Sequence, residues 1–426
     1  MTASEPSDSP PDSAALGHVL AIRDFRLFLS ARIVAGLAMQ MLGVAIGWHL
    51  YDLTSDPMAL GYAGLAVFLP IAIFTLPAGD VADRLDRRKI IAASHFTQAL
   101  CAAVLLGLAV AGSAEIWPFY AVLALSGMAR AFSGPAISSF LPFLVPREQF
   151  ANAVGWSSSA SQTSMILGPA LGGVLYLLGA EVVFAVCLAC SLAMAAAILA
   201  IRTRVTPITA DQGVTAWSRA LSGLAYVRRQ PIIFGAITLD LFAVLLGGIT
   251  ALLPIYARDI LEVGPDGLGV MRSAMAVGAV SMALLLANLP SSRHPHGGRA
   301  IFLGVALFGA AILVFGVSRD FALSLAALFA MGVGDVISVF VRQTVMQLAT
   351  PDAMRGRVTA VHMLFVGASN ELGDFRAGVV AAWLGTVPAV LLGGVGTLAV
   401  VGLWAWLFPD LRRIDRLADV KPRAGD

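Results

Sequence analysis

The feature that most constrains this chain is a series of long apolar segments separated by short polar connections. A helix of about 20 residues spans the ~30 Å hydrocarbon core of a bilayer. Because backbone groups find no water inside that core, such segments must form helices. We count twelve of them, with the approximate limits 26–51, 58–80, 89–112, 117–140, 153–178, 182–201, 232–256, 266–289, 300–318, 321–345, 358–382 and 386–408.

The composition excludes a water-soluble globule, since 58% of the residues are hydrophobic and only 13% are charged. Soluble domains carry roughly 25% charged residues. A formal net charge of +2 does not suit a nucleic-acid binder. The three cysteines lie inside apolar segments, so they do not indicate a secreted disulfide scaffold. We therefore predict an all-α polytopic membrane protein.

The basic residues predict the orientation of the spans. If the N-terminal tail is cytoplasmic, 21 of the 28 basic residues lie on the cytoplasmic side, two (Arg258 and Arg319) lie outside, and five lie within spans. Cytoplasmic loops of membrane proteins carry such an excess of Lys and Arg. We expect a multi-pass protein of the cytoplasmic (inner) cell membrane with both termini in the cytoplasm.

An internal repeat predicts two similar bundles. A shift of 205 residues superposes Pro146 on Pro351, Gly168 on Gly373, and Arg130 on Asp335. Six spans repeated in the same orientation are typical of two bundles around a central cavity. We expect a disordered cytoplasmic tail, a six-helix bundle, a cytoplasmic linker with an amphipathic helix, a second six-helix bundle and a cytoplasmic tail, at 1–22, 23–201, 202–230, 231–408 and 409–426.

The loop GDVADRLDRRK, which follows the second span, is a candidate conformational latch. Gly79 would let two helices approach closely. An acid and several arginines nearby would bind helix ends and charged partners, and release them during a conformational change. The latch residues are Gly79, Asp83, Arg84, Arg87 and Arg88. The alternative is that these basic residues only fix the topology.

The same loop resembles the signature G-x-x-x-D-R-x-G-R-R of the major facilitator superfamily. Asp86 stands where that signature has glycine. Because Asp tolerates a left-handed turn better than most residues, we expect the loop to keep its conformation with Asp86 in place of glycine. MARAFSG in the fourth span resembles the superfamily's R-x-x-x-G pattern through Arg130 and Gly134.

Two further resemblances refine this assignment. ILGPALGG in the fifth span resembles the superfamily's antiporter motif through Gly168, Pro169, Gly172 and Gly173. Stretches such as FRLFLSARIV and LATPDAMRGRVTAV resemble the branch of enterobactin-type exporters and transmembrane secretion effectors. The resemblance implies secondary active export of small amphiphilic molecules, commonly by proton antiport.

The glycines of the antiporter-like motif also have a packing interpretation. Ser164, Gly168 and Gly172 follow one another at intervals of four residues, which makes a smooth face for another helix. Pro169 removes a backbone hydrogen bond and permits a bend. Packing alone would explain each glycine without a role in transport.

Charged residues within the spans are the strongest functional signal. Each costs roughly 2.5–3.5 kcal/mol at a helix centre, so it normally faces a partner or water. Asp240 lies in the seventh span, and Asp335 lies near the middle of the tenth, with Arg342 seven residues later on the same face. Arg130 in the fourth span is expected to pair with an acid or to hold an anionic substrate group.

The eleventh span carries two acids on one stripe. Gly367, Glu371, Asp374 and Gly378 share this stripe at helical spacing. Two carboxylates one turn apart repel each other in a low dielectric, which favours proton binding by one of them. Asp335 and Glu371 are the leading candidates for coupling transport to protons. We expect Asp374, Asp240, Arg130 and Arg342 to lie in the same coupling or substrate cavity. The alternative is a fixed salt-bridge network that only holds helices together.

These observations predict a proton-coupled exporter of a drug-like or siderophore-like molecule. An importer or uniporter on the same fold is an alternative, and a non-transporting receptor or assembly partner is another. We do not expect an enzyme, because no nucleophile–base pair or metal-ligand set stands out. No P-loop is present, so we expect no cofactor and a proton gradient as the energy source. The expected partners are a small-molecule substrate, protons and the lipid bilayer, and we expect a monomer.

Overall fold

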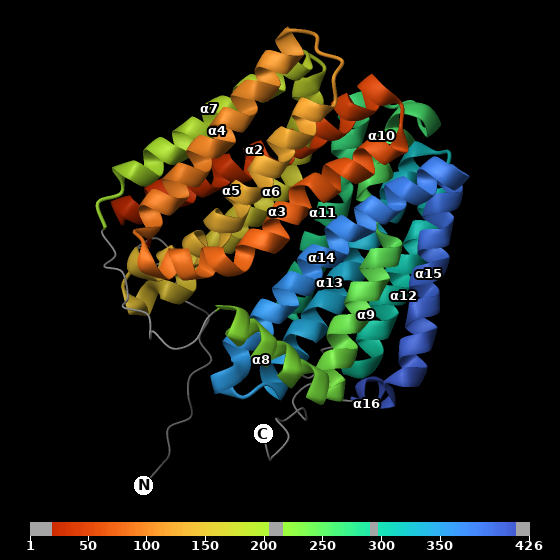
Figure 1. Cartoon of the computed structure of the whole chain (residues 1–426). Coiled ribbons are helices and arrows are strands. Elements are labelled where there is room, and N and C mark those ends of the chain that lie inside the picture. The colour runs from red at the N-terminus through yellow and green to blue at the C-terminus, as the bar shows by residue number, and fades with distance from the viewer. Residues whose placement is uncertain (1–18, 204–215, 290–296, 415–426) are drawn as a thin grey trace.

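A computed structural model describes residues 19–203, 216–289 and 297–414, and its regular elements are helices throughout (Figure 1). The first half contains α2 (Arg23–Thr54), α3 (Pro57–Arg84), α4 (Arg87–Val110), α5 (Trp117–Phe140), α6 (Phe150–Tyr176) and α7 (Ala180–Ala200), with short 3-10 helices at Leu141–Phe143 and Arg147–Gln149. The second half contains α8 (Ala216–Arg229), α9 (Pro231–Gly247), α11 (Gly264–Asn288), α12 (Gly297–Val317), α13 (Phe321–Ala349), α14 (Asp352–Leu384), α15 (Thr386–Leu407) and the short α16 (Pro409–Arg412).

Aspartates start several of these helices. The Asp56 carboxylate accepts a hydrogen bond from the Met58 N–H at 2.8 Å, and Pro57 follows at the first helical position of α3. The Asp320 carboxylate caps α13 through the Leu323 N–H at 2.7 Å. Such caps satisfy backbone donors that have no partner within the helix, which matters most where water is scarce.

Each of the twelve predicted spans corresponds to a helix in the described part of the chain. Within the described residues, nine helices are long and apolar enough to cross a membrane by length and composition alone. The three that are not, α5, α6 and α14, carry several serines and glycines and the charged residues Arg130, Glu371 and Asp374.

The seventh span differs from the continuous segment that the sequence predicts. α9 ends at Gly247, and the chain continues through a 3-10 turn (Thr250–Leu252), α10 (Leu253–Ile255) and a π-helical turn (Tyr256–Ile260). Gly247 and Gly248 weaken the helix at this point. A Cβ on Gly248 would stand 2.9 Å from the Gly373 carbonyl carbon, so α14 crosses where the helix breaks.

The amphipathic helix predicted in the linker is α8, and it packs mainly on the start of α14. A Cβ on Gly223 would stand 2.7 Å from the Arg357 carbonyl oxygen. Tyr226 and Val227 are buried with Val358 and Val361 of α14. α8 is therefore part of the second half, at the end where the two halves are connected.

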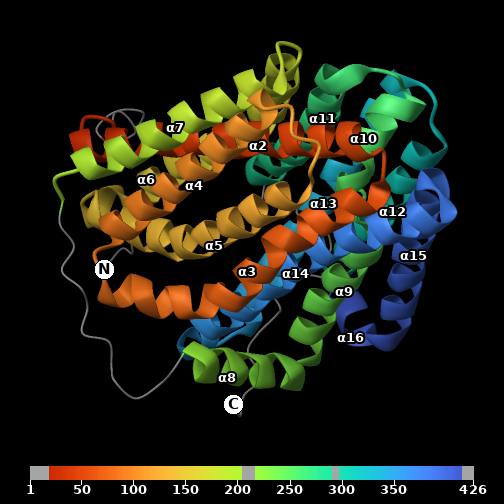
Figure 2. The same ribbon diagram turned by 45° about the horizontal axis from the view of Figure 1, so that its top comes forward.

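The two halves lie side by side, with α3 along α14 and α6 along α11 (Figures 1 and 2). One cluster of buried apolar residues draws on both halves and surrounds the end of α2, α10 and the start of α11. The other three clusters of described residues each belong to a single half. We call the end that bears Tyr51 and Tyr256 the closed end, and the opposite end, which bears Arg23 and α8, the linker end.

Candidate functional site

Glycines bring α3 and α14 together in the interface between the halves. A Cβ on Gly378 would stand 2.8 Å from the Gly61 Cα, so the two backbones touch. Two turns earlier on α14, Glu371 lies against Gly64, where a Cβ would be 3.6 Å from the Glu371 Oε2. The predicted stripe of α14 therefore faces the first half of the molecule.

Glu371 lies among charges from both halves. It interacts electrostatically with Asp374, one turn away, and with Arg130 of α5. Asp374 accepts a hydrogen bond from the Ala251 N–H at 3.2 Å, in the break after α9. It also interacts electrostatically with Arg272 and Arg376. We call Arg130, Arg272, Glu371 and Asp374 the interface cluster; it has two acids and two bases.

Arg272 of α11 is a member of this cluster that the sequence interpretation did not select. Its guanidinium points to α2, where a Cβ on Gly43 would be 3.1 Å from Nη1. Its Nε is buried and has no hydrogen-bond partner among the described residues. The sequence placed Arg272 inside a span, but no acid lies three or four residues away on its own helix to mark it as functional. Its counterpart Asp374 lies on another helix.

A second group of charges lies inside the second half. Arg342 of α13 forms an ion pair with Asp240 of α9, with only 3% and 8% of the two side chains exposed. Asp335 interacts electrostatically with both of them. His362 of α14 is buried nearby and interacts with Arg342 and Asp240. We call these four residues the second-half cluster.

The structure therefore separates the two acids from which the sequence predicts proton coupling. Asp335 belongs to the second-half cluster, and Glu371 belongs to the interface cluster. Arg342 shares a helix face with Asp335, but its ion pair is with Asp240 across the helix contact. His362 was missed because a single histidine in a predicted span has no sequence signal that distinguishes it.

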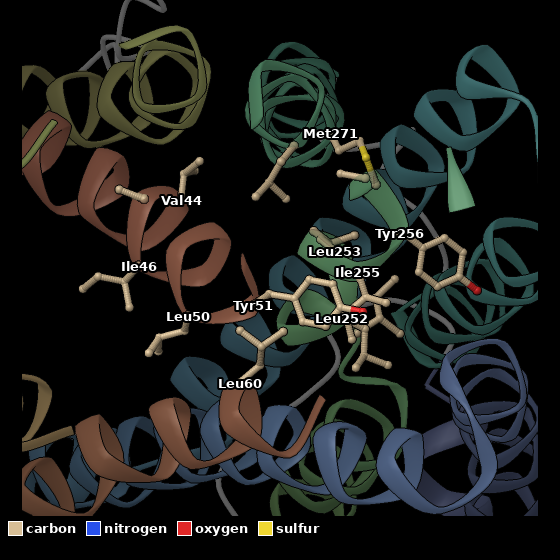
Figure 3. Close-up of a cluster of buried hydrophobic side chains, with 14 of the residues drawn as sticks. Val44, Ile46, Leu50, Tyr51, Leu60, Leu252, Leu253, Ile255, Tyr256 and Met271 are labelled. Atoms are coloured by element: carbon tan, nitrogen blue, oxygen red, sulfur yellow. The ribbon is translucent and has the colours of Figure 1, made fainter. Parts of the chain in front are cut away.

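A polar lock joins the halves at the closed end. The Tyr51 hydroxyl donates a short hydrogen bond to Asp259. Arg258 forms an ion pair with Asp52 at 3.2 Å, and its Nη1 also donates to the Tyr51 carbonyl at 3.2 Å. Figure 3 shows the Tyr51 ring beside Leu252 and Ile255, so apolar packing accompanies the polar contacts.

The candidate latch loop makes contacts within the first half. The Arg88 Nη1 donates to the Ile201 carbonyl, and the buried Arg87 guanidinium lies 5.0 Å from the centre of the Phe143 ring. Arg84 is exposed at the end of α3, and the side chain of Asp83 lies outside the described residues.

Two details of this loop correct the sequence interpretation. Asp86 does not form a left-handed turn: its φ is −61°, and its carboxylate caps α4 through the Arg88 N–H at 3.0 Å. An N-cap needs an acceptor side chain, which aspartate has and glycine lacks. The close approach predicted at Gly79 is not present, since no described atom lies within 4 Å of where a Cβ would stand.

The glycine motif of α6 faces two helices at once. A Cβ on Gly168 would be 2.5 Å from the Gln40 Cβ, and one on Gly172 would be 2.7 Å from the Met41 Cα, so α2 packs on this face. Pro169 and Gly173 face α11 of the second half: a Cβ on Gly269 would be 2.5 Å from the Pro169 carbonyl oxygen. The motif therefore sits where the first half meets the second.

Comparisons with known proteins agree with this architecture. A family model described as transmembrane secretion effector matches residues 18–424. Macrolide efflux protein A of Streptococcus pyogenes is 32% identical over 152 residues, which are 36% of this chain and only 38% of that protein. The enterobactin exporter EntS of Shigella boydii is 23% identical over 396 residues, which are 91% of this chain and 92% of that protein. A crystal structure of a POT family transporter in complex with 5-aminolevulinic acid has the same fold, with a TM-score of 0.74 at 10% identity over 92% of this chain and 97% of that one.

Proposed function

Because the chain belongs to the transmembrane secretion effector family of the major facilitator superfamily, we propose that it exports a small amphiphilic molecule across the cytoplasmic membrane by proton antiport and alternating access. Membership of this family makes it a multi-pass membrane transporter related to efflux proteins, and not an enzyme. Beyond that membership, we propose the proton as the coupling ion, export as the direction of transport and a small amphiphilic molecule as the cargo.

The observation that carries the proposal is the interface cluster. Glu371 lies on the helix of the second half that touches α3, and its electrostatic partner Arg130 belongs to the first half. A charge here acts on the contact between the halves. Protonation of Glu371 would remove its attraction to Arg130, whereas ionised Glu371 would draw the halves together. Proton binding and the relative position of the halves are thereby linked.

The distribution of basic residues supports the sidedness of the proposal. In the topology predicted from the sequence, 21 of the 28 lysines and arginines fall on the side of the linker and termini. We therefore assign the linker end and both termini to the cytoplasm. The structure then corresponds to a state closed to the outside, in which cargo enters between the halves from the cytoplasm. The opposite state would require the closed-end lock to separate.

The latch loop fits the opposite state better than the present one. The open space beside Gly79 leaves room for a helix of the second half to approach the end of α3. Arg84 is exposed at the same place and is available to an acidic partner. We propose that this loop holds the linker end together when the closed end opens.

The proposed cargo class rests on the relatives. One is called a macrolide efflux protein, and another is called an enterobactin exporter. Macrolides and siderophores are both small, partly apolar molecules with polar groups. A cavity with apolar walls and a few charges near its centre would accept such compounds. We propose that the chain acts as a monomer and needs no cofactor.

The test uses everted membrane vesicles with an acidic lumen, in which a pH-sensitive dye reports the proton gradient. Macrolides, catechol siderophores and cationic amphiphiles are added one at a time. The proposal predicts a cargo-dependent proton leak in the wild type. Glu371→Gln should abolish this leak because a glutamine cannot exchange the proton.

Glu148→Gln is the matched control, since Glu148 is an exposed acid in the short helix before α6. It should keep the wild-type leak. A full leak in Glu371→Gln would contradict the assigned proton carrier. Cargo flux without any proton leak would indicate a uniporter, and binding without flux would indicate a receptor.

A further inference from the structure

A small cavity lies inside the second half, between α9, α12 and α13. Its polar lining consists of Asp240, Asp335 and Ser338, and its walls are apolar, Phe308 among them. Its volume of about 10 Å³ accommodates one water-sized occupant. Asp240 and Ser338 are buried, whereas Asp335 is half-buried.

Ser338 behaves unlike the other hydroxyl residues of these helices. Thr344 and Thr238 donate their hydroxyls to the carbonyls of Phe340 and Phe234, one turn earlier, as buried hydroxyls in helices commonly do. Ser338 is only 2% exposed, and its Oγ has no partner among the described residues. A buried hydroxyl without a partner is destabilising, so this one points to an occupant that it would bind.

The charges around the cavity define the occupant. Asp240 and Asp335 contribute two negative charges and Arg342 contributes one positive charge, which leaves a net charge of −1. The buried His362 is the other titratable group that interacts with this set. A single monovalent cation neutralises the cavity, whereas a divalent ion would leave it positive. Carboxylate and hydroxyl oxygens are the ligands of hard cations.

We propose that Asp240, Asp335 and Ser338 form a binding site for a monovalent metal cation, Na⁺. Arg342 holds one oxygen of Asp240, and the remaining carboxylate oxygens and the Ser338 hydroxyl coordinate the ion. Among the described residues, no group of three His, Cys, Asp or Glu side chains gathers in a metal-binding arrangement. The proposed site therefore rests on two carboxylates and one hydroxyl. The site shares no residue with the interface cluster, so the test below and the proton test at Glu371 address different side chains.

The test measures the melting temperature of the purified full-length protein in detergent while NaCl replaces choline chloride at constant ionic strength. A ligand that binds only the folded state raises this temperature in a saturable way. We expect such a rise with NaCl and a much weaker one with KCl, because the cavity is small. Asp335→Asn should abolish the rise, and Ser338→Ala should raise the half-saturating NaCl concentration about tenfold.

Ser324→Ala is the matched control, since Ser324 is a buried serine on the same helix whose hydroxyl bonds to Ser318. It should keep the wild-type response to NaCl. If Asp335→Asn does not fold, broadening of the ²³Na resonance by the wild type and by Ser338→Ala replaces it. Equal melting in NaCl and choline chloride, or an unchanged response in Ser338→Ala, would overturn the proposal. Neither result would affect the proton test at Glu371.

Discussion

At the scale of single residues, the chain keeps charges in its interior by pairing them across helices. Asp240 and Arg342 are both almost fully buried and form an ion pair between α9 and α13. Such a pair contributes little net stability, but either member alone is an uncompensated buried charge. Each of the two buried charges is therefore strongly destabilising when its partner is removed.

This dependence gives a prediction. Arg342→Met should lower the free energy of unfolding by about 3–5 kcal/mol, because it leaves the Asp240 carboxylate without its partner. The double variant Asp240→Asn/Arg342→Met should recover most of that loss. Titration with sodium dodecyl sulfate, followed by tryptophan fluorescence, measures both. Equal destabilisation of the single and double variants would show that the pair does not act by mutual neutralisation.

The sequence identified most of these charges but not their partners. Helical spacing placed Arg342 on the face of Asp335, whereas the ion pair forms with Asp240, about 100 residues earlier in the chain. Neither Arg272 nor His362 has an acid three or four residues away on its own helix, so helical spacing gave no signal for them. Partners on other helices depend on rotation and packing, which periodicity within one helix does not determine.

At the scale of helices, the spans follow directly from hydropathy and length, because a bilayer permits few other structures. The exception is the break after Gly247, where two glycines and the crossing of α14 end a helix that hydropathy alone predicts to continue. The cap at Asp86 is another local feature that composition did not specify. Glycine positions, by contrast, were informative, since those of α6 do lie in close contacts with α2.

The glycines of α14 allow a matched test. Gly378→Leu should force α3 away from α14, because its Cβ would stand 2.8 Å from the Gly61 Cα. We expect a loss of about 1–3 kcal/mol in stability together with loss of transport. Gly367→Leu on the same helix should be tolerated, since no described atom lies within 4 Å of its Cβ position. Folded yield and vesicle transport measure both; equal effects would contradict the role assigned to the contact.

At the scale of the whole molecule, one buried apolar core of the described residues is shared by both halves, and it lies at the closed end. That core and the lock formed by Tyr51, Asp52, Arg258 and Asp259 lie at the closed end, whereas the linker end has separate clusters in each half. The interface cluster lies along the contact between the halves. We propose that proton exchange at the interface cluster determines whether the halves are joined at the closed end or at the linker end.

The most direct test measures distances across both ends with pairs of spin labels. One pair replaces Ala114 and Arg319 at the closed end, and the other replaces Lys89 and Arg413 at the linker end; all four residues are exposed. Combined with Glu371→Gln, which mimics the protonated side chain, the closed-end distance should lengthen and the linker-end distance should shorten relative to the same pairs with Glu371 intact. Unchanged distances at both ends, in a variant that still folds, would contradict the account.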